Sequence, residues 1–220
     1  MEYEILYEDA FLMAVRKPAG LATESAKAFE PDLVSRLRDH LGSAPGVVHR
    51  LDQPVEGLLV FGKTKEMTAL LSEQLREGSL GKEYRALVFD MPDPAAGELT
   101  GYLRKEPGGR AQVRAKAPGS PEWKAAKLTY ETLRGFGEEA AEVRVTLQTG
   151  RFHQIRAQFA AAGHPLLGDR KYGTPESAEL SRRLGIRNTA LCAYMLRFRH
   201  PKTGEELTFE IEPFWEEEKI

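Results

Sequence analysis

An alternation of apolar and polar side chains in the second half of the chain is the pattern that most limits how it can fold. Residues 141–148 read AEVRVTLQ, so the apolar side chains recur at every second position. A period of two places alternate side chains on opposite faces of a β-strand. The segment is therefore predicted to be a half-buried strand, with Glu142 on its polar face, and it requires a sheet to pair with.

Similar patterns divide the rest of the chain into short strands and amphipathic helices. Strands are predicted at 5–7, 12–15, 57–61, 84–89, 190–199 and 207–211, the last two joined by a turn at 201–204. Helices are predicted at 33–41 after the N-cap Asp32, at 67–75 before Gly78, and at 155–162 before Gly163. Residues 92–121 are rich in Gly, Pro and basic residues and are expected to form loops or irregular strands. Strands joined by hairpins, with helices between them, indicate an α+β fold with a largely antiparallel sheet.

Composition excludes several classes of protein. The chain is 41% hydrophobic and 29% charged, and no apolar stretch is long enough to span a bilayer. The N-terminus lacks the pattern of a signal peptide, and the single cysteine, Cys192, cannot form an internal disulfide. We therefore expect a soluble protein of the reducing cytoplasm, without a membrane partner. The sequence has neither a glycine-rich phosphate loop nor Cys/His residues at metal-ligand spacing, so no cofactor and no metal are expected.

Charge is unevenly distributed, although the net charge is only −2. Residues 205–220 hold seven glutamates and one lysine, whereas residues 104–127, hereafter the basic segment, hold seven Lys/Arg against two glutamates. Such a segment could bind a polyanion such as RNA, or it could be a solvated loop. Charge alone does not choose between these two readings.

Chemistry is concentrated in the segment His49-Arg50-Leu51-Asp52, which stands just before the apolar run Gly57–Phe61. A turn directly before a buried strand presents its side chains from a rigid scaffold, as binding and catalytic sites require. Read by itself, the segment could equally be a surface turn with local ion pairs.

The segment resembles the signature of the RluA-like RNA pseudouridine synthases, and two other segments agree in order and spacing. Gly81-Lys82-Glu83-Tyr84 resembles the lysine-x-tyrosine element of that family. Residues 149–156, TGRFHQIR, followed by Gly163–Asp169, resemble its third motif, and Lys17-Pro18-Ala19-Gly20-Leu21 resembles its opening. The resemblance runs from about Leu6 to about Pro213.

The resemblance implies both a fold and a set of site residues. It implies one catalytic domain over residues 1–220, with a central mixed, mainly antiparallel sheet, peripheral helices and a catalytic cleft. It makes Asp52 the catalytic carboxylate, paired with Arg156. It implies that the target nucleotide is bound by the following residues: His49, Arg50, Tyr84, Ile155 and Arg156.

The reaction implied is isomerisation of selected uridines in rRNA or tRNA, which needs no cofactor. We expect a compact member of the family without the extra N-terminal RNA-binding module. We also expect a monomer without an obligate protein partner. The chain departs from the family pattern at four positions, where the family usually has Thr, Ser, Thr and His: Val55, Glu56, Phe152 and Gln158.

Two other functional classes fit some of the same residues. A non-catalytic RNA-binding protein could keep the fold without the chemistry, and a product assay separates it from an enzyme. A hydrolytic nucleosidase could use the same carboxylate and would release free uracil. Asp52 and Glu56 also suggest a two-carboxylate glycosidase, but the family resemblance gives Glu56 no acid role.

Overall fold

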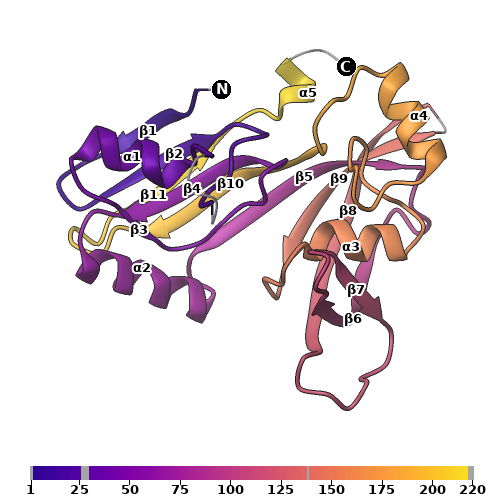
Figure 1. Ribbon diagram of the computed structural model, residues 1–220, viewed down its shortest axis with the longest axis horizontal. Helices are drawn as coiled ribbons and strands as arrows, with labels where there is room; N and C mark the ends of the chain where they lie inside the picture. Colours follow the sequence, from indigo (N-terminus) through magenta and orange to yellow (C-terminus); the bar gives the residue numbers. More distant parts are fainter. Residues whose placement is uncertain (1, 26–29, 138, 218–220) are drawn as a thin grey trace. The chain divides into compact units, whose positions relative to one another are not determined.

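A computed structural model of the protein describes residues 2–25, 30–137 and 139–217 (Figure 1). These residues fall into two units, which are built separately around their own strands. Unit 1 lies within residues 1–82 and 192–213, and unit 2 lies within residues 83–191 and 214–220.

The sheet of unit 1 is mixed. Its main strands follow the order β1–β2–β4–β10, with β3 added to β4 and β11 added to β10. Only β10 and β4 run parallel among these pairs; the others are antiparallel. The strands are β1 (Glu4–Glu8), β2 (Leu12–Lys17), β3 (Gly46–Val47), β4 (Glu56–Gly62), β10 (Leu191–Arg199) and β11 (Glu206–Glu210).

Strand β4 is buried along its whole length, as the apolar run in the sequence predicts. It approaches β10 so closely that Gly57, at φ +138°, has no room for a side chain: a Cβ there would lie 2.6 Å from the backbone nitrogen of Ala193. Only glycine adopts this conformation without strain. The close contact aligns the start of β4, and hence the turn that precedes it, against β10.

The helices of unit 1 begin and end where their capping residues predict. In α1 (Leu33–Leu41), Asp32 accepts a hydrogen bond from the backbone N–H of Ser35 at 2.7 Å. Helix α2 (Lys65–Glu77) ends at Gly78, whose left-handed backbone lets its N–H bond the last carbonyls. Among the residues that the structure describes, an apolar cluster in the core of this unit consists of Leu12, Leu58, Val60, Leu71, Leu80, Leu196 and Phe198.

The sheet of unit 2 is antiparallel, in the order β5–β9–β8–β6–β7. Its strands are β5 (Gly81–Phe89), β6 (Ala96–Lys105), β7 (Ala111–Arg114), β8 (Lys124–Phe136) and β9 (Ala140–Leu147). The expectation of loops or irregular strands at 92–121 was wrong for β6, which pairs regularly along eight residues with β8. The partner strand supplies the hydrogen bonds that the local Gly- and Pro-rich sequence does not signal.

The described part of unit 2 holds three helices, and the sequence patterns predicted only one of them. Helix α3 (Gln154–Ala161) begins and ends one residue before the predicted range of 155–162. Helix α4 (Pro175–Arg183) begins with a capping box between Thr174 and Ser177, and α5 (Phe214–Glu217) is a single turn near the C-terminus.

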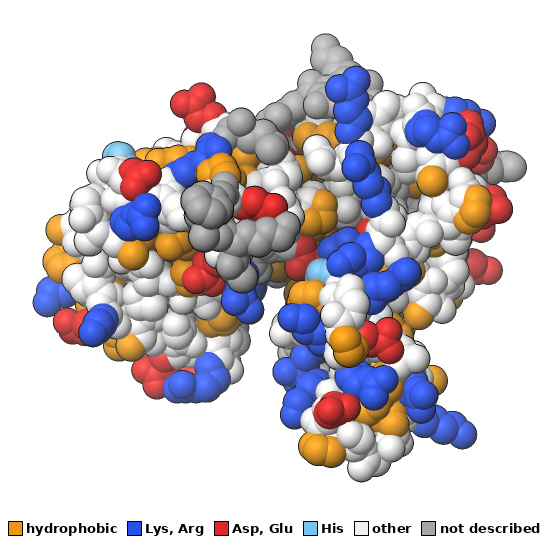
Figure 2. Space-filling model, viewed as in Figure 1, with side chains coloured by type: hydrophobic (Ala, Val, Ile, Leu, Met, Phe, Trp, Pro, Cys, Tyr) orange, Lys and Arg blue, Asp and Glu red, His pale blue; other side chains and the backbone are white. Residues whose placement is uncertain are grey.

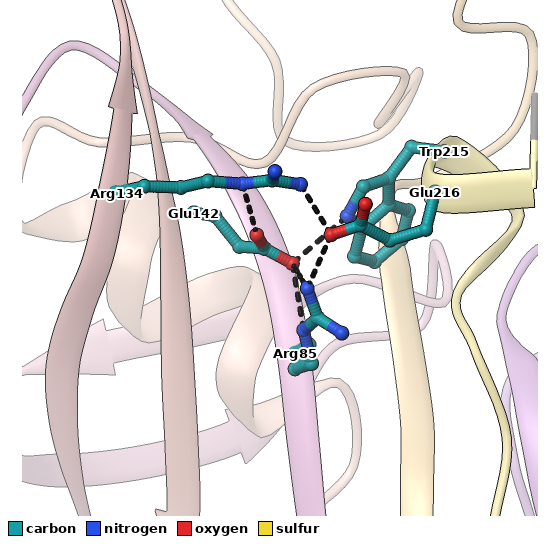
Figure 3. A network of polar contacts seen from close by, with 5 residues as sticks. All are labelled: Arg85, Arg134, Glu142, Trp215 and Glu216. Atoms are coloured by element: carbon teal, nitrogen blue, oxygen red, sulfur yellow. Dashed lines mark hydrogen bonds and ion pairs between the residues drawn. The ribbon is translucent and has the colours of Figure 1, made fainter. Parts of the chain in front are cut away.

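A buried carboxylate joins α5 to the sheet of unit 2 (Figure 3). Glu142 is fully buried, and it accepts hydrogen bonds from Arg85 Nε at 2.7 Å, Arg134 Nε at 2.8 Å and the indole Nε1 of Trp215 at 2.9 Å. Glu216 also pairs with both arginines. Burial alone would lower the pKa of Arg85, but the adjacent carboxylates raise it. The alternation predicted that Glu142 lies on a polar, solvent-facing side of β9. The structure buries this side chain instead, because Trp215 packs there.

Candidate active site

Asp52 lies half-buried in the turn that leads into β4. Its backbone carbonyl accepts a hydrogen bond from the N–H of Val55 at 3.1 Å, which closes the turn. On either side the chain is held by a neighbouring loop: Thr23 bonds both backbone groups of Leu51, and the N–H of Gly20 donates to the carbonyl of Gln53 at 2.7 Å. The carboxylate therefore belongs to a turn whose backbone is fixed at both ends.

Lys17, the last residue of β2, is the cation buried beneath this turn. Its Nζ donates to the carbonyls of Leu21 at 2.7 Å and Pro18 at 3.0 Å, and reaches that of Gln53 at 3.4 Å. Burial lowers the pKa of Lys17 from 10.5 to about 7, although the negative charges of Asp52 and Glu56 act in the opposite direction. The sequence reading missed this residue as part of the site, although a lysine ending an apolar strand was a usable signal.

The two residues before Asp52 differ sharply in exposure. Arg50 is exposed, and its guanidinium lies 3.5 Å from the carboxylate of Glu24. His49 is 7% exposed, and burial, followed by the charge of Lys82, holds its pKa well below the usual value. Its Nε2 accepts from the backbone N–H of Val60 at 3.4 Å, so the neutral ring carries its proton on Nδ1.

Glu56, the second carboxylate considered from the sequence, is buried and forms an ion pair with Arg16 at 3.4 Å. An ion-paired carboxylate is held in its ionised form. A general acid must instead carry a proton at working pH. The pairing therefore does not favour the two-carboxylate reading.

Tyr84, Ile155 and Arg156 belong to unit 2, and all three are buried. Tyr84 lies on β5 and pairs with Val145 of β9, in agreement with its strand spacing. Ile155 and Arg156 lie in the first turn of α3. The preceding residue, His153, has φ +53°, a backbone conformation uncommon outside glycine.

Arg156 forms a bidentate pair with Asp169. Its Nε donates to Oδ2 at 2.7 Å and its Nη2 to Oδ1 at 2.8 Å, with both side chains almost completely buried. Burial would raise the pKa of Asp169, but the hydrogen bond and charge of Arg156, with the backbone N–H groups of Lys171 and Tyr172, lower it. Because the guanidinium is a rigid, planar fork, this bidentate pair fixes the orientation of the Arg156 side chain.

Asp169 is thus a second residue whose role was missed in the sequence, although it stood at the end of the third motif. The ring of Tyr172 packs beside the Arg156–Asp169 pair. The guanidinium carbons of Arg156 and Arg110 lie 5.2 and 5.3 Å from the ring centroid, so the ring contacts both cations.

The basic segment lies on β6, β7 and the start of β8, and Figure 2 shows lysine and arginine side chains gathered over this part of unit 2. Two of its arginines are ordered by one aromatic ring: the guanidinium groups of Arg104 and Arg114 each lie 4.9 Å from the ring centroid of Trp123. Stacked guanidinium groups lose little side-chain entropy when they bind phosphate. This ordered arrangement of arginines agrees better with a segment that binds a polyanion than with a solvated loop.

Comparison with known proteins agrees with the sequence motifs. The family described as RNA pseudouridylate synthase matches residues 12–161. The dual-specificity RNA pseudouridine synthase RluA of Salmonella typhimurium is 34% identical over 94% of this chain and 91% of its own length. Ribosomal large subunit pseudouridine synthase C of Pasteurella multocida is also 34% identical, over 94% of this chain and 63% of its own.

Solved structures give the same fold. Human RNA pseudouridylate synthase domain containing 4 aligns with a TM-score of 0.74 at 24% identity, covering 96% of this chain and 88% of that one. Human RNA pseudouridylate synthase domain containing 1 aligns with a TM-score of 0.77 at 22% identity, covering 96% and 83%. The predicted α+β pseudouridine synthase fold, with its mixed sheet and few helices, is confirmed.

A fold and motifs of this kind define an isomerase that converts uridine in RNA to pseudouridine. The chain belongs to the RNA pseudouridylate synthase family, as an RluA-like member. Within the ranges that the structure describes, every helix falls short of the length and apolar character that a membrane crossing needs.

Proposed function

We propose that this enzyme isomerises specific uridines of rRNA, tRNA or both, with Asp52 as the catalytic carboxylate. The observation that carries the proposal is the Asp52 turn: a half-buried carboxylate on a backbone fixed at both ends, beside a buried lysine, in a member of this family. In the reaction the bond from C1′ to uracil N1 breaks, the base turns, and C1′ bonds to uracil C5. The proton on C5 leaves, and N1 gains one, so no oxidant or external group is consumed.

Asp52 can act by attacking the sugar or by removing a proton from it. Both routes require the ionised carboxylate. The amine of Lys17, held by three carbonyls below the turn, carries its charge at pH values near or below its pKa of about 7, and in that form it is suited to stabilise the carboxylate before the base leaves. The other predicted site residues bind or orient the target nucleotide in this proposal.

Extrusion of a base from its stack costs roughly a few kcal/mol, which protein contacts must offset. We assign exposed Arg50 to the gap that the base leaves in the RNA, and Tyr84 and Ile155 to apolar contact with the freed base. Arg156, oriented by Asp169, supplies fixed donors. His49 is buried, so its contribution is to support the turn through Val60 and shape the floor of the nucleotide site.

The choice of RNA follows from the relatives. The names of two relatives specify the ribosomal large subunit and dual specificity. We extend these substrate classes to this chain, with rRNA first. We further propose that both units act as one catalytic domain, as a monomer in the cytoplasm, and that the basic segment binds the phosphates of the substrate.

The decisive experiment is a pseudouridine map of total RNA from cells without this gene, complemented by wild type, Asp52→Asn or Asp39→Asn. Asp39 is an exposed carboxylate on α1 and serves as the matched control. One or a few sites should vanish without the gene and return with wild type and with Asp39→Asn, but not with Asp52→Asn. Restoration by Asp52→Asn would overturn the catalytic assignment, and release of free uracil by the purified enzyme would indicate a nucleosidase instead.

A further inference from the structure

Phe152 is an aromatic side chain that the structure leaves in solvent. It is 39% exposed, although an apolar ring of this size is ordinarily buried. It stands two residues before the start of α3, in the third motif, at a position where the family usually has threonine. The ring is therefore a feature of this chain that neither the core nor the shared motif accounts for.

A second ring holds Phe152 in place. The imidazole of His153 stacks on it with centroids 3.7 Å apart and planes inclined by 20°. His153 is fixed in turn: its Nδ1 lies 2.8 Å from the hydroxyl of Tyr172, and that hydroxyl accepts the backbone N–H of Ala111 at 2.6 Å. The pair is thus a preformed stack rather than a mobile side chain.

A cation accompanies the stack. The Nζ of Lys105, at the end of β6, lies 4.7 Å from the centroid of the Phe152 ring. Lys105 is exposed, and a cation–π contact at an exposed site is weak, so the flexible side chain can swing from the ring to a nearby anion. Together they match the two parts of one nucleotide: the ring can stack on its flat base, and the ammonium group can pair with its phosphate.

We infer that the Phe152–His153 stack binds an unpaired base of the substrate RNA. This base belongs to a nucleotide other than the one that is isomerised, and Lys105 moves to the phosphate of the stacked nucleotide. The inference rests on the proposed function in one respect, that RNA is the substrate. RNA is favoured over an apolar peptide because the stack adjoins the basic segment, whose charge complements a polyanion. Stacking reads no base edge, so the site adds affinity and register rather than sequence choice.

The test uses short single-stranded RNA without uridine, labelled once with fluorescein for anisotropy and once with 2-aminopurine to report stacking. Because the probe offers no uridine, binding is measured without turnover. Phe152→Leu keeps an apolar side chain but removes the ring, and Phe152→Tyr keeps the ring. Leu133→Ala, at a similarly exposed apolar position of unit 2, is the matched control.

We expect Phe152→Leu to weaken binding by at least about fivefold and to abolish the quenching of 2-aminopurine, since stacking on a base is worth that much or more. Phe152→Tyr and Leu133→Ala should behave as wild type. Lys105→Gln should keep the quenching and lower the salt dependence of binding by about one phosphate contact. Equal affinity and quenching for wild type and Phe152→Leu, or no binding of the probe by wild type, would overturn the inference.

A pseudouridine assay on the same preparations separates this inference from the proposed function. If wild type forms pseudouridine but Phe152→Leu binds RNA normally, the stacking site is wrong and the proposed function stands. If Phe152→Leu binds weakly and wild type forms no pseudouridine, the stacking site stands and the proposed reaction fails.

Discussion

Replacement of Lys17 by methionine tests the buried cation beneath the Asp52 turn. Methionine has a similar length and no charge, so the change removes the ammonium group and its bonds to the carbonyls of Leu21, Pro18 and Gln53. In wild type the pKa of Lys17 is about 7 in the folded protein and ordinarily 10.5. Between these values the unfolded chain binds a proton that the folded protein does not.

The sign of the effect follows from that difference. Wild-type stability is complete above the unfolded pKa and is lost as the pH falls toward the folded pKa, where the buried amine takes up its charge. From pH 7 to pH 9, the free energy of unfolding of wild type should rise by about 2 kcal/mol relative to Lys17→Met. Groups that titrate alike in both proteins, including Lys82, cancel in this difference.

The assay is urea unfolding of both proteins at several values between pH 7 and pH 9, with the difference in free energy plotted against pH. Lys65→Met, at an exposed position of the same unit, is the control. A difference between wild type and Lys17→Met that stays constant with pH would refute the argument, because it would mean that Lys17 has the same proton affinity folded and unfolded. The variant should also lose most of its kcat, since the turn carrying Asp52 loses its support.

Three further predictions concern unit 2. Glu142→Gln should lower the free energy of unfolding by about 3 kcal/mol, measured in urea, because it removes the buried negative charge that Arg85, Arg134 and Trp215 share. Asp169→Asn should lower kcat more than it raises KM, measured on unmodified RNA, because Arg156 loses the partner that orients it. Glutamine at three positions of the basic segment should weaken RNA binding and reduce the slope of log affinity against log salt by roughly 2; the positions are Arg110, Arg114 and Lys116.

Matched variants make these predictions specific. Glu131→Gln, an exposed partner of Arg144, should cost less than about 1 kcal/mol. A cost for Glu142→Gln no larger than that would contradict the burial argument. Full activity of folded Asp169→Asn would remove Asp169 from the site. For the salt experiment, exposed arginines on α1, α2 and α4 provide a control triple, Arg38, Arg76 and Arg182, and equal slopes for both triples would exclude the basic segment from phosphate binding.

Local patterns in the sequence were sufficient for most elements of the fold. The alternation at 141–148 is β9, Asp32 caps α1, and Gly78 ends α2. These signals depend on neighbours within a few residues, so a sequence displays them directly. The same holds for the Asp52 segment, whose motif was legible and whose position before β4 was predicted from the apolar run, while its catalytic role stays a prediction.

The tertiary structure decided which polar groups are buried and what holds them. Glu142 follows the alternation of an exposed side chain, yet Trp215, 73 positions later, covers it. Lys17 reaches the carbonyl of Gln53, 36 positions away, and Arg156 reaches Asp169. A buried charge must find partners, and those partners come from segments that only folding brings together, so periodicity could not reveal them.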